Sequence, residues 1–322
     1  GRPRPDSFPA TADEVRLHVD VSALLVAAHL EMLDDVERIH RPIRIAHGTT
    51  EALLSMRRQL DPVQPLKLRA QQQVERLVSD GRLAVGSSAG MLDSEGLLPE
   101  LVGAQGPEWA ALVAEAKSSG GFVVEYLPLQ SSQGPLSVPS PISSLLVNCG
   151  AIGRSLRRHG IIPADQLETA CLALGSEAAE LPEEASIERA TLLLLSAGIA
   201  ELLAEAGILE AACDAFRLRL GVSDHQRLQA CLRQAEYDAD SRVWLDGLIE
   251  RLREGLAAGR YDLQAQAPLP EAFKDPRVGP IVASLLQLLS AKHQPGDVLW
   301  IEDRALGRSS TEWPVGVVSA SD

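Results

Sequence analysis

Val298-Leu-Trp-Ile-Glu-Asp-Arg-Ala-Leu306, close to the C-terminus, is a short apolar run that ends in two adjacent acids. Such a run is typical of a buried parallel strand, and open α/β sheets carry their functional groups at the carboxyl ends of their strands. A second run, Leu17-His-Val-Asp-Val-Ser-Ala-Leu-Leu25, places Asp20 where a strand pattern passes into a helical one. Together the two runs predict an α/β fold with a metal site at a sheet edge.

The composition is that of a globular protein. The 322 residues are 45% hydrophobic, which is enough for about two domains. The net charge of −14 excludes a broad basic surface for nucleic acid, so any contact with nucleic acid must be local. No apolar run approaches the roughly 20 residues of a membrane span, so we expect no membrane association. The four cysteines form no C-x-x-C pair and are expected to be reduced core thiols, as in a cytoplasmic protein.

The pattern along the chain alternates between strands and helices. A strand over 17–21 leads to a helix capped by Ser22, and a strand over 43–45 leads to a helix that begins at Thr49 or Thr50. Further helices are predicted over 71–78, 108–117, 142–156 and 164–174, and a further strand over 122–126. Three prolines in 131–141 mark a domain boundary.

The second half of the chain resembles the first. The matched pairs are Val19-Asp-Val-Ser22-Ala23 with Leu193-Leu-Leu-Ser196-Ala197, Ile43-Arg-Ile45 with Leu218-Arg-Leu220, Glu75-Arg-Leu77 with Glu254-Gly-Leu256, and Phe122-Val-Val-Glu125-Tyr126 with Leu299-Trp-Ile-Glu302-Asp303. This pattern predicts a tandem repeat of two related α/β units. The alternative is that 186–206 forms one leucine-rich amphipathic helix, which the lack of β-branched residues favours.

The expected division is a linker or appended end over 1–12, an α/β unit over 13–130, a linker and helical segment over 131–185, and a second α/β unit over 186–322. In an alternative division, 13–60 and 275–322 form one domain and the middle is inserted. The chain begins with Gly1 rather than Met, so we expect it to be a piece of a longer protein whose other domains are candidate partners.

The opening strand with its acid, the acid in the helix after the second strand, and the late acidic strand resemble the PIN-like nuclease family. The resemblance covers the ends best, over 17–60 and 275–318. It implies three-layer units around a parallel sheet, with carboxylates that hold Mg²⁺ or Mn²⁺. It also implies hydrolysis of RNA or single-stranded nucleic acid by a metal-activated water.

Position by position, the resemblance assigns Asp20 as the opening acid, Glu51 as the helical acid and Asp303 as the acid that ends the late strand. Glu302 is its neighbour, and these four are the candidate catalytic residues. Asp20, Asp303 and Glu302 are the candidate metal ligands. Successive side chains of a strand face opposite ways, so only one of Glu302 and Asp303 is expected in the cleft, and Asp303 is preferred.

Two departures from the family weaken the assignment of activity. Tyr126 aligns with Asp303 in the first unit, and Leu194 aligns with Asp20 in the second, so neither unit has a full set of acids. The two units could share one composite site, the ends could form one domain, or both could be decayed. The alternative function is therefore an inactive PIN-derived scaffold that binds another protein or domain.

Other sequence features point to no further chemistry. The histidines at 18, 29, 40 and 47 lack ligand spacing on one helix face, and we expect them to be structural or exposed. Neither a G-x-G-x-x-G phosphate loop nor a G-x-S-x-G nucleophile motif occurs in the sequence.

Overall fold

The computed structural model of the chain describes residues 15–62, 64–86, 99–131, 134–175, 187–264, 279–302 and 316–319. The chain divides into two compact units. Unit 1 consists of Gly1–Asp61 and Tyr237–Asp322, and unit 2 is Pro62–Glu236. The boundaries therefore fall at 61/62 and 236/237 rather than within 131–185, and unit 1 holds both ends of the chain, as in the alternative division.

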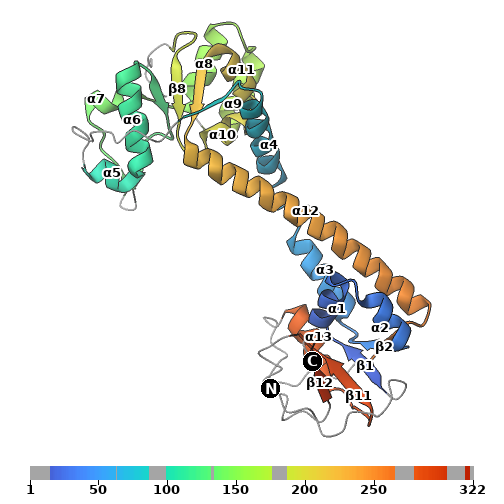
Figure 1. The fold of residues 1–322 in the computed structure, drawn as a ribbon. Helices are drawn as coiled ribbons and strands as arrows, with labels where there is room; N and C mark the ends of the chain where they lie inside the picture. Colours follow the sequence, from blue (N-terminus) through green and yellow to red (C-terminus); the bar gives the residue numbers. More distant parts are fainter. Residues whose placement is uncertain are drawn as a thin grey trace. The chain divides into compact units, whose positions relative to one another are not determined.

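Unit 1 is built on a five-stranded parallel sheet with the order β10-β2-β1-β11-β12 (Figure 1). Its strands are β1 Arg16–Val19, β2 Ile43–Ile45, β10 Tyr261–Leu263, β11 Asp297–Trp300 and β12 Gly316–Val318. Its helices are α1 Val21–His29, α2 Leu33–Ile39, α3 Thr49–Gln59, α13 Pro280–Ser290 and the C-terminal part of α12 Val222–Ala257. The late acidic strand thus pairs directly with the opening strand, with Val19 level with Trp300.

Unit 2 contains a second five-stranded parallel sheet, with the order β3-β9-β8-β4-β7. Its strands are β3 Ala84–Val85, β4 Phe122–Val124, β7 Leu146–Val147, β8 Leu192–Leu195 and β9 Arg217–Leu220. Its helices are α4 Pro65–Ser79, α5 Pro99–Gln105, α6 Pro107–Ser119, α7 Ser140–Ser143, α8 Cys149–Arg158, α9 Ala164–Ala173, α10 Ile199–Glu205, α11 Leu209–Ala215 and the N-terminal part of α12. A separate antiparallel ribbon joins β5 Gln130–Ser131 to β6 Gly134–Pro135.

The two sheets have the same succession of strands. When β1 is matched with β8, the sheet neighbours match in turn: β2 with β9, β10 with β3, β11 with β4 and β12 with β7. Two short helices follow β1 and β8 alike, namely α1 with α2, and α10 with α11. In chain order, however, unit 2 starts at the strand that corresponds to β10, so the two units are related by a circular permutation.

The matched positions differ from the register that the sequence repeat predicts. Trp300 pairs with Val19 in unit 1, and Val124 pairs with Leu195 in unit 2. When the two sheets are matched by these ladders, the residue of unit 2 at the position equivalent to Asp20 is therefore Ser196 rather than Leu194. By the same match, Tyr126 of unit 2 occupies the position equivalent to Glu302 of unit 1 rather than that of Asp303.

The core of unit 1 lies on both faces of its sheet. On one face, Leu24, Ile45 and Leu53 pack with Leu248 and Ile249 of α12. On the other face, Leu288 of α13 packs against Leu299 and Ile301. This cluster also contains Ala46, Leu285 and Leu289. Apolar side chains from both chain segments therefore close this unit.

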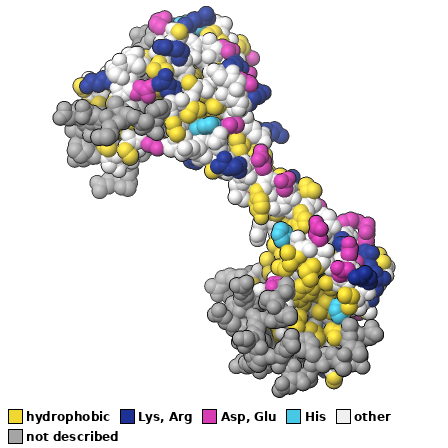
Figure 2. Space-filling view, viewed as in Figure 1, with side chains coloured by type: hydrophobic (Ala, Val, Ile, Leu, Met, Phe, Trp, Pro, Cys, Tyr) yellow, Lys and Arg dark blue, Asp and Glu magenta, His cyan; other side chains and the backbone are white. Residues whose placement is uncertain are grey.

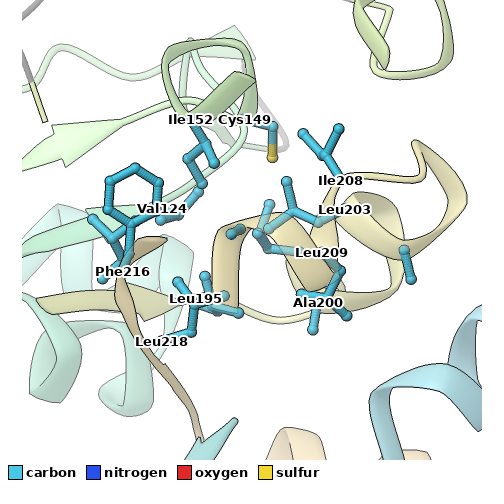
Figure 3. Close-up of a cluster of buried hydrophobic side chains, with 14 of the residues drawn as sticks. Val124, Cys149, Ile152, Leu195, Ala200, Leu203, Ile208, Leu209, Phe216 and Leu218 are labelled. Carbon is cyan, nitrogen blue, oxygen red and sulfur yellow. The ribbon is translucent and has the colours of Figure 1, made fainter. Parts of the chain in front are cut away.

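The core of unit 2 is larger on the face that carries α4, α8, α10 and α11. Figure 3 shows Leu195 and Leu218 of the sheet beside Ala200, Leu203 and Leu209. On the opposite face, Trp109 and Val113 of α6 pack against Val123 and Leu194. The four consecutive leucines of β8 are buried on both sides, which explains why their sequence shows no alternation.

Several predicted elements differ from the observed ones. Leu192–Leu195 forms a strand, so the alternative of one helix over 186–206 is wrong for the described residues. The predicted helix over 142–156 is split by β7, and Asp20 rather than Ser22 is the N-cap of α1. Within the described residues no helix has the length and apolar character that a membrane crossing requires.

Candidate functional site

The acid of the opening strand lies at the carboxyl edge of the unit 1 sheet. Asp20 follows β1 directly, and its backbone N–H donates to Trp300 O at 3.2 Å. Its Oδ1 accepts from Ala23 N at 2.8 Å, and the Ser22 hydroxyl lies 2.9 Å from both carboxylate oxygens. These bonds satisfy the first turn of α1 and fix the carboxylate, which is 2% exposed.

Glu302 is brought to the same edge from the other end of the chain. Its backbone N–H donates to Ser22 Oγ at 3.1 Å, so Ser22 links Asp20 to Glu302. The Glu302 side chain accepts from Trp300 Nε1 at 2.6 Å through Oε1. The strands β1 and β11 are neighbours in the sheet. After β1 the chain continues to β2 on one side of this pair, and after β11 it continues to β12 on the other side. Such a switch point is where open α/β sheets bind ligands.

The other two predicted residues are placed differently. Glu51 lies on the first turn of α3, and its side chain is exposed. Asp303, the acid preferred for the cleft, lies outside the described residues. Among the described residues, Asp20, Glu51 and Glu302 do not form a group with metal-ligand spacing. Within the part of the chain that the structure describes, one such group occurs, and it consists of His18, His293 and Asp297.

The carboxyl edge of unit 2 holds a cavity of about 310 Å³. Its wall includes the ends of β3, β4, β8 and β9 and the first turn of α12. Glu125 and Ser196 lie at the switch point between β4 and β8, and Trp109 of α6 lines the same cavity. A cavity of this size is at the lower end of the range for small-molecule sites.

Glu125 is the polar centre of this cavity. Burial raises the pKa of its carboxyl, while the Tyr126 N–H, the Ser196 hydroxyl and the Trp109 indole N–H oppose that rise. Tyr126 N donates to Glu125 Oε1 at 2.8 Å. Ser196 Oγ and Trp109 Nε1 are buried and face this carboxyl without reaching hydrogen-bond geometry with a described residue. The cavity therefore offers buried polar atoms that a bound molecule could pair.

Two groups of charges frame the cavity. Arg219 forms an ion pair with Glu115 on one wall. Asp224 pairs with Arg227 through Oδ1, and Arg227 Nη2 also lies 2.9 Å from Glu201 Oε1.

Burial raises the pKa of the neighbouring Cys149 thiol to about 12, so this thiol is neutral and unreactive at neutral pH.

Reasoning from sequence names Asp20 and Glu302 as candidates and does not identify the other two groups. Glu125 and Ser196 were visible as strand-end residues, yet the alignment shift of the repeat concealed that Ser196 is level with Asp20. His18 was expected to be structural or exposed, and nothing in the sequence connects it with His293 and Asp297. No family model, curated protein or solved structure matches this chain.

Proposed function

We propose that the chain is a PIN-like, nuclease-derived protein whose unit 1 carries a divalent-metal centre for hydrolysis of RNA or single-stranded nucleic acid. Its ligands would be Asp20 and Glu302, together with Asp303 by the family resemblance. The observation that carries the proposal is the Asp20–Ser22–Glu302 linkage at the switch point of a parallel sheet.

The residues present suit a hard divalent cation. Carboxylate oxygens are the ligands that Mg²⁺ and Mn²⁺ prefer, and Asp20 and Glu302 supply them from adjacent strands. The Ser22 hydroxyl and the Ala23 N–H hold the Asp20 carboxylate in place. A bound ion would activate the water that attacks the phosphodiester.

The shared strand succession supports the proposal of two PIN-like units. In chain order the strands form two sets, β1-β2-β3-β4-β7 and β8-β9-β10-β11-β12, which have matching positions in the two sheets. Unit 1 takes its first two strands from the first set and its last three from the second, and unit 2 does the reverse. This arrangement is that of a tandem duplication whose copies have exchanged halves.

Cleavage of labelled single-stranded RNA in the presence of Mn²⁺ or Mg²⁺ tests the proposal. Asp20→Asn is the decisive variant, because asparagine is as good an N-cap as aspartate but lacks the charge. We expect cleavage by the wild type and a loss of at least about 100-fold in this variant, the scale of losing a major electrostatic group. Asp35→Asn, at an exposed ion pair with Arg38, is the control and should cleave normally. Absence of cleavage by the wild type would overturn the proposal.

A non-catalytic binding module is the second candidate, and unit 2 favours it. Ser196 stands at the level of Asp20, and the adjacent cavity combines Trp109 with the buried Glu125 carboxyl. A flat base carries amino groups that can donate to the Glu125 carboxylate. The cavity wall has the acids Glu108, Glu115 and Asp224 against the single arginine Arg219, and this excess of negative charge disfavours phosphate. We therefore propose an unphosphorylated nucleoside as the ligand.

Thermal unfolding with and without free nucleosides tests this candidate. A nucleoside should raise the melting temperature of the wild type and have no effect on Glu125→Leu. Glu168→Leu, a change of the same kind in α9 outside the cavity wall, should respond like the wild type. Equal responses of wild type and Glu125→Leu, or no response to any nucleoside, would rule out this ligand class.

A further inference from the structure

A buried cluster of two histidines and one aspartate lies in unit 1, apart from the Asp20 cap. His18 is in β1, Asp297 begins β11, and His293 lies between α13 and β11. The His18 and Asp297 side chains are fully buried, and that of His293 is 4% exposed. Three residues of the types that bind metal ions are therefore buried together in unit 1.

The tautomer of each imidazole follows from the hydrogen bond of the ring nitrogen that faces away from Asp297. His18 Nδ1 lies 3.3 Å from Gln264 Oε1, and His293 Nε2 lies 3.0 Å from Leu288 O. A backbone carbonyl only accepts, so His293 Nε2 carries the proton, and the side-chain oxygen of Gln264 places the His18 proton on Nδ1. The opposite nitrogens, His18 Nε2 and His293 Nδ1, then present lone pairs when the rings are neutral.

These lone pairs face the Asp297 carboxylate. His18 Nε2 is 3.4 Å from Oδ1, and His293 Nδ1 is 3.8 Å from Oδ2. The three potential ligand atoms lie within 4.8 Å of one another. His18 Nε2 and His293 Nδ1 are buried without a hydrogen-bond partner among the described residues, whereas Asp297 Oδ1 has the Arg16 guanidinium beside it in an ion pair. Acceptors turned towards one another in a dry site are costly, and a cation between them removes that cost.

Neighbouring groups position the carboxylate. Gln294 N donates to Asp297 Oδ2 at 2.7 Å, and Arg16 Nε lies 2.9 Å from Oδ1 in an ion pair. The Arg16 guanidinium offsets one negative charge but leaves both imidazole lone pairs unmatched. Such outer contacts are usual around metal-binding side chains, where they hold the first ligands in place.

We propose that His18, His293 and Asp297 bind one Zn²⁺ ion that joins the two chain segments of unit 1. Two imidazoles and one carboxylate are a zinc donor set, whereas Mg²⁺ prefers oxygen ligands alone. Ligands on a tetrahedral zinc ion with bonds of about 2.0 Å are roughly 3.3 Å apart, close to the His18–Asp297 separation.

The position of the cluster gives the ion a structural role. His18 comes from the first segment of unit 1 and His293 and Asp297 from the second, with unit 2 inserted between them. The chain loses conformational entropy when folding brings such distant positions together. A shared ion offsets part of that cost. The ion would therefore stabilise unit 1 by linking its two chain segments.

Metal uptake by the full chain tests this site. After removal of metals with a chelator, Zn²⁺ binding is titrated by calorimetry, and Co²⁺ is added as a spectroscopic probe. In the Asp20→Asn background, which disables the proposed nuclease centre, we expect one ion per chain, intense visible absorption from a tetrahedral Co²⁺ complex, and a higher melting temperature. His293→Gln and Asp297→Asn should each weaken binding by at least about 100-fold, the upper end of losses for outer-shell changes.

Two controls separate this site from others. His225→Gln removes a histidine that pairs with Glu75 in unit 2 and should leave Zn²⁺ affinity unchanged. Asp20→Asn should also leave it unchanged, so failure of the nuclease centre and failure of the zinc site are distinguishable. Circular dichroism of His293→Gln and Asp297→Asn shows whether each folds. The proposal is overturned if the wild type binds no Zn²⁺ at 100-micromolar concentrations, on the order of a weak protein site, or if folded variants bind equally well.

Discussion

Ser196 in unit 2 occupies the strand-end position that Asp20 occupies in unit 1. The Ser196 backbone N–H donates to Val124 O at 3.1 Å, and the Asp20 backbone N–H donates to Trp300 O at 3.2 Å. Both residues follow the central strand of a five-stranded parallel sheet. The two sheets therefore present different side chains at equivalent switch points, an acid in one and a hydroxyl in the other.

Ser196→Asp should destabilise unit 2, because a second carboxylate would lie beside the buried Glu125 carboxyl. We expect a loss of about 1–3 kcal/mol in the free energy of unfolding, the usual cost of an unsatisfied buried polar group. Millimolar Mg²⁺ should recover part of it. Urea unfolding with and without Mg²⁺ measures both effects, and Ser196→Ala is the uncharged control. Equal stability of Ser196→Asp and the wild type would contradict the assigned position of this side chain.

Asp20→Ala should destabilise unit 1 by about 1 kcal/mol, because alanine cannot accept the Ala23 N–H at the start of α1. Asp20→Asn keeps an acceptor oxygen and should lose little. Urea denaturation of the two variants separates the capping role of the side chain from its charge. A large loss in Asp20→Asn with no metal present would mean that the charge itself stabilises the fold.

Glu125→Gln should stabilise unit 2 at neutral pH and have little effect at acidic pH. The pKa of Glu125 is raised by burial, so its neutral form is favoured in the folded state. Stability from such a group is present below the unfolded pKa of about 4.3 and is lost as pH rises through the folded pKa. Glutamine stays neutral, so its advantage should grow from about pH 4 upward. Thermal unfolding of both proteins across roughly pH 3.5–8, which spans this titration, checks the sign of the stability difference. Greater stability of Glu125→Gln at acidic pH alone would contradict the prediction.

Much of each sheet can be predicted from local patterns. The apolar runs at 17–19, 43–45, 122–124 and 298–300 are strands, as their composition predicts. Boundaries are less predictable, since β7 has only two residues and interrupts an apparently continuous helical pattern. Asp20 replaces Ser22 as the N-cap because an acid directly before the helix can reach the Ala23 N–H.

The pairing of strands from different halves of the chain cannot be predicted in the same way. If the two strand sets are copies of one unit, as proposed above, their similarity gives equal support to pairing within a copy and to pairing between copies. The cluster around His18 has the same difficulty, because its partners His293 and Asp297 lie in the other half of the chain. Only the long-range packing of β1 against β11 brings these residues together.

The pairing of strands from the two halves of the chain gives a final prediction about two fragments. In the described structure, β1 and β2 pair with β10 and β11, while β8 and β9 pair with β3 and β4. A fragment over 1–180 and a fragment over 181–322 would each hold strands of both sheets, and each would lack the partners that it has in the chain. Figure 2 shows acidic and basic side chains mixed on the visible faces.

Mixed in equal amounts, the two fragments should form a 1:1 complex that survives size-exclusion chromatography at micromolar concentration. The complex buries the Leu193, Leu195 and Leu218 side chains of one fragment against Val74 and Leu77 of the other. Leu193→Ala, in the centre of this core, should cost about 2–5 kcal/mol and weaken the complex. Leu172→Ala, at a side chain that is 79% exposed, is the matched control and should not. Two stable monomers that ignore each other would show that each copy folds on its own strands, and the exchange of halves would then be wrong.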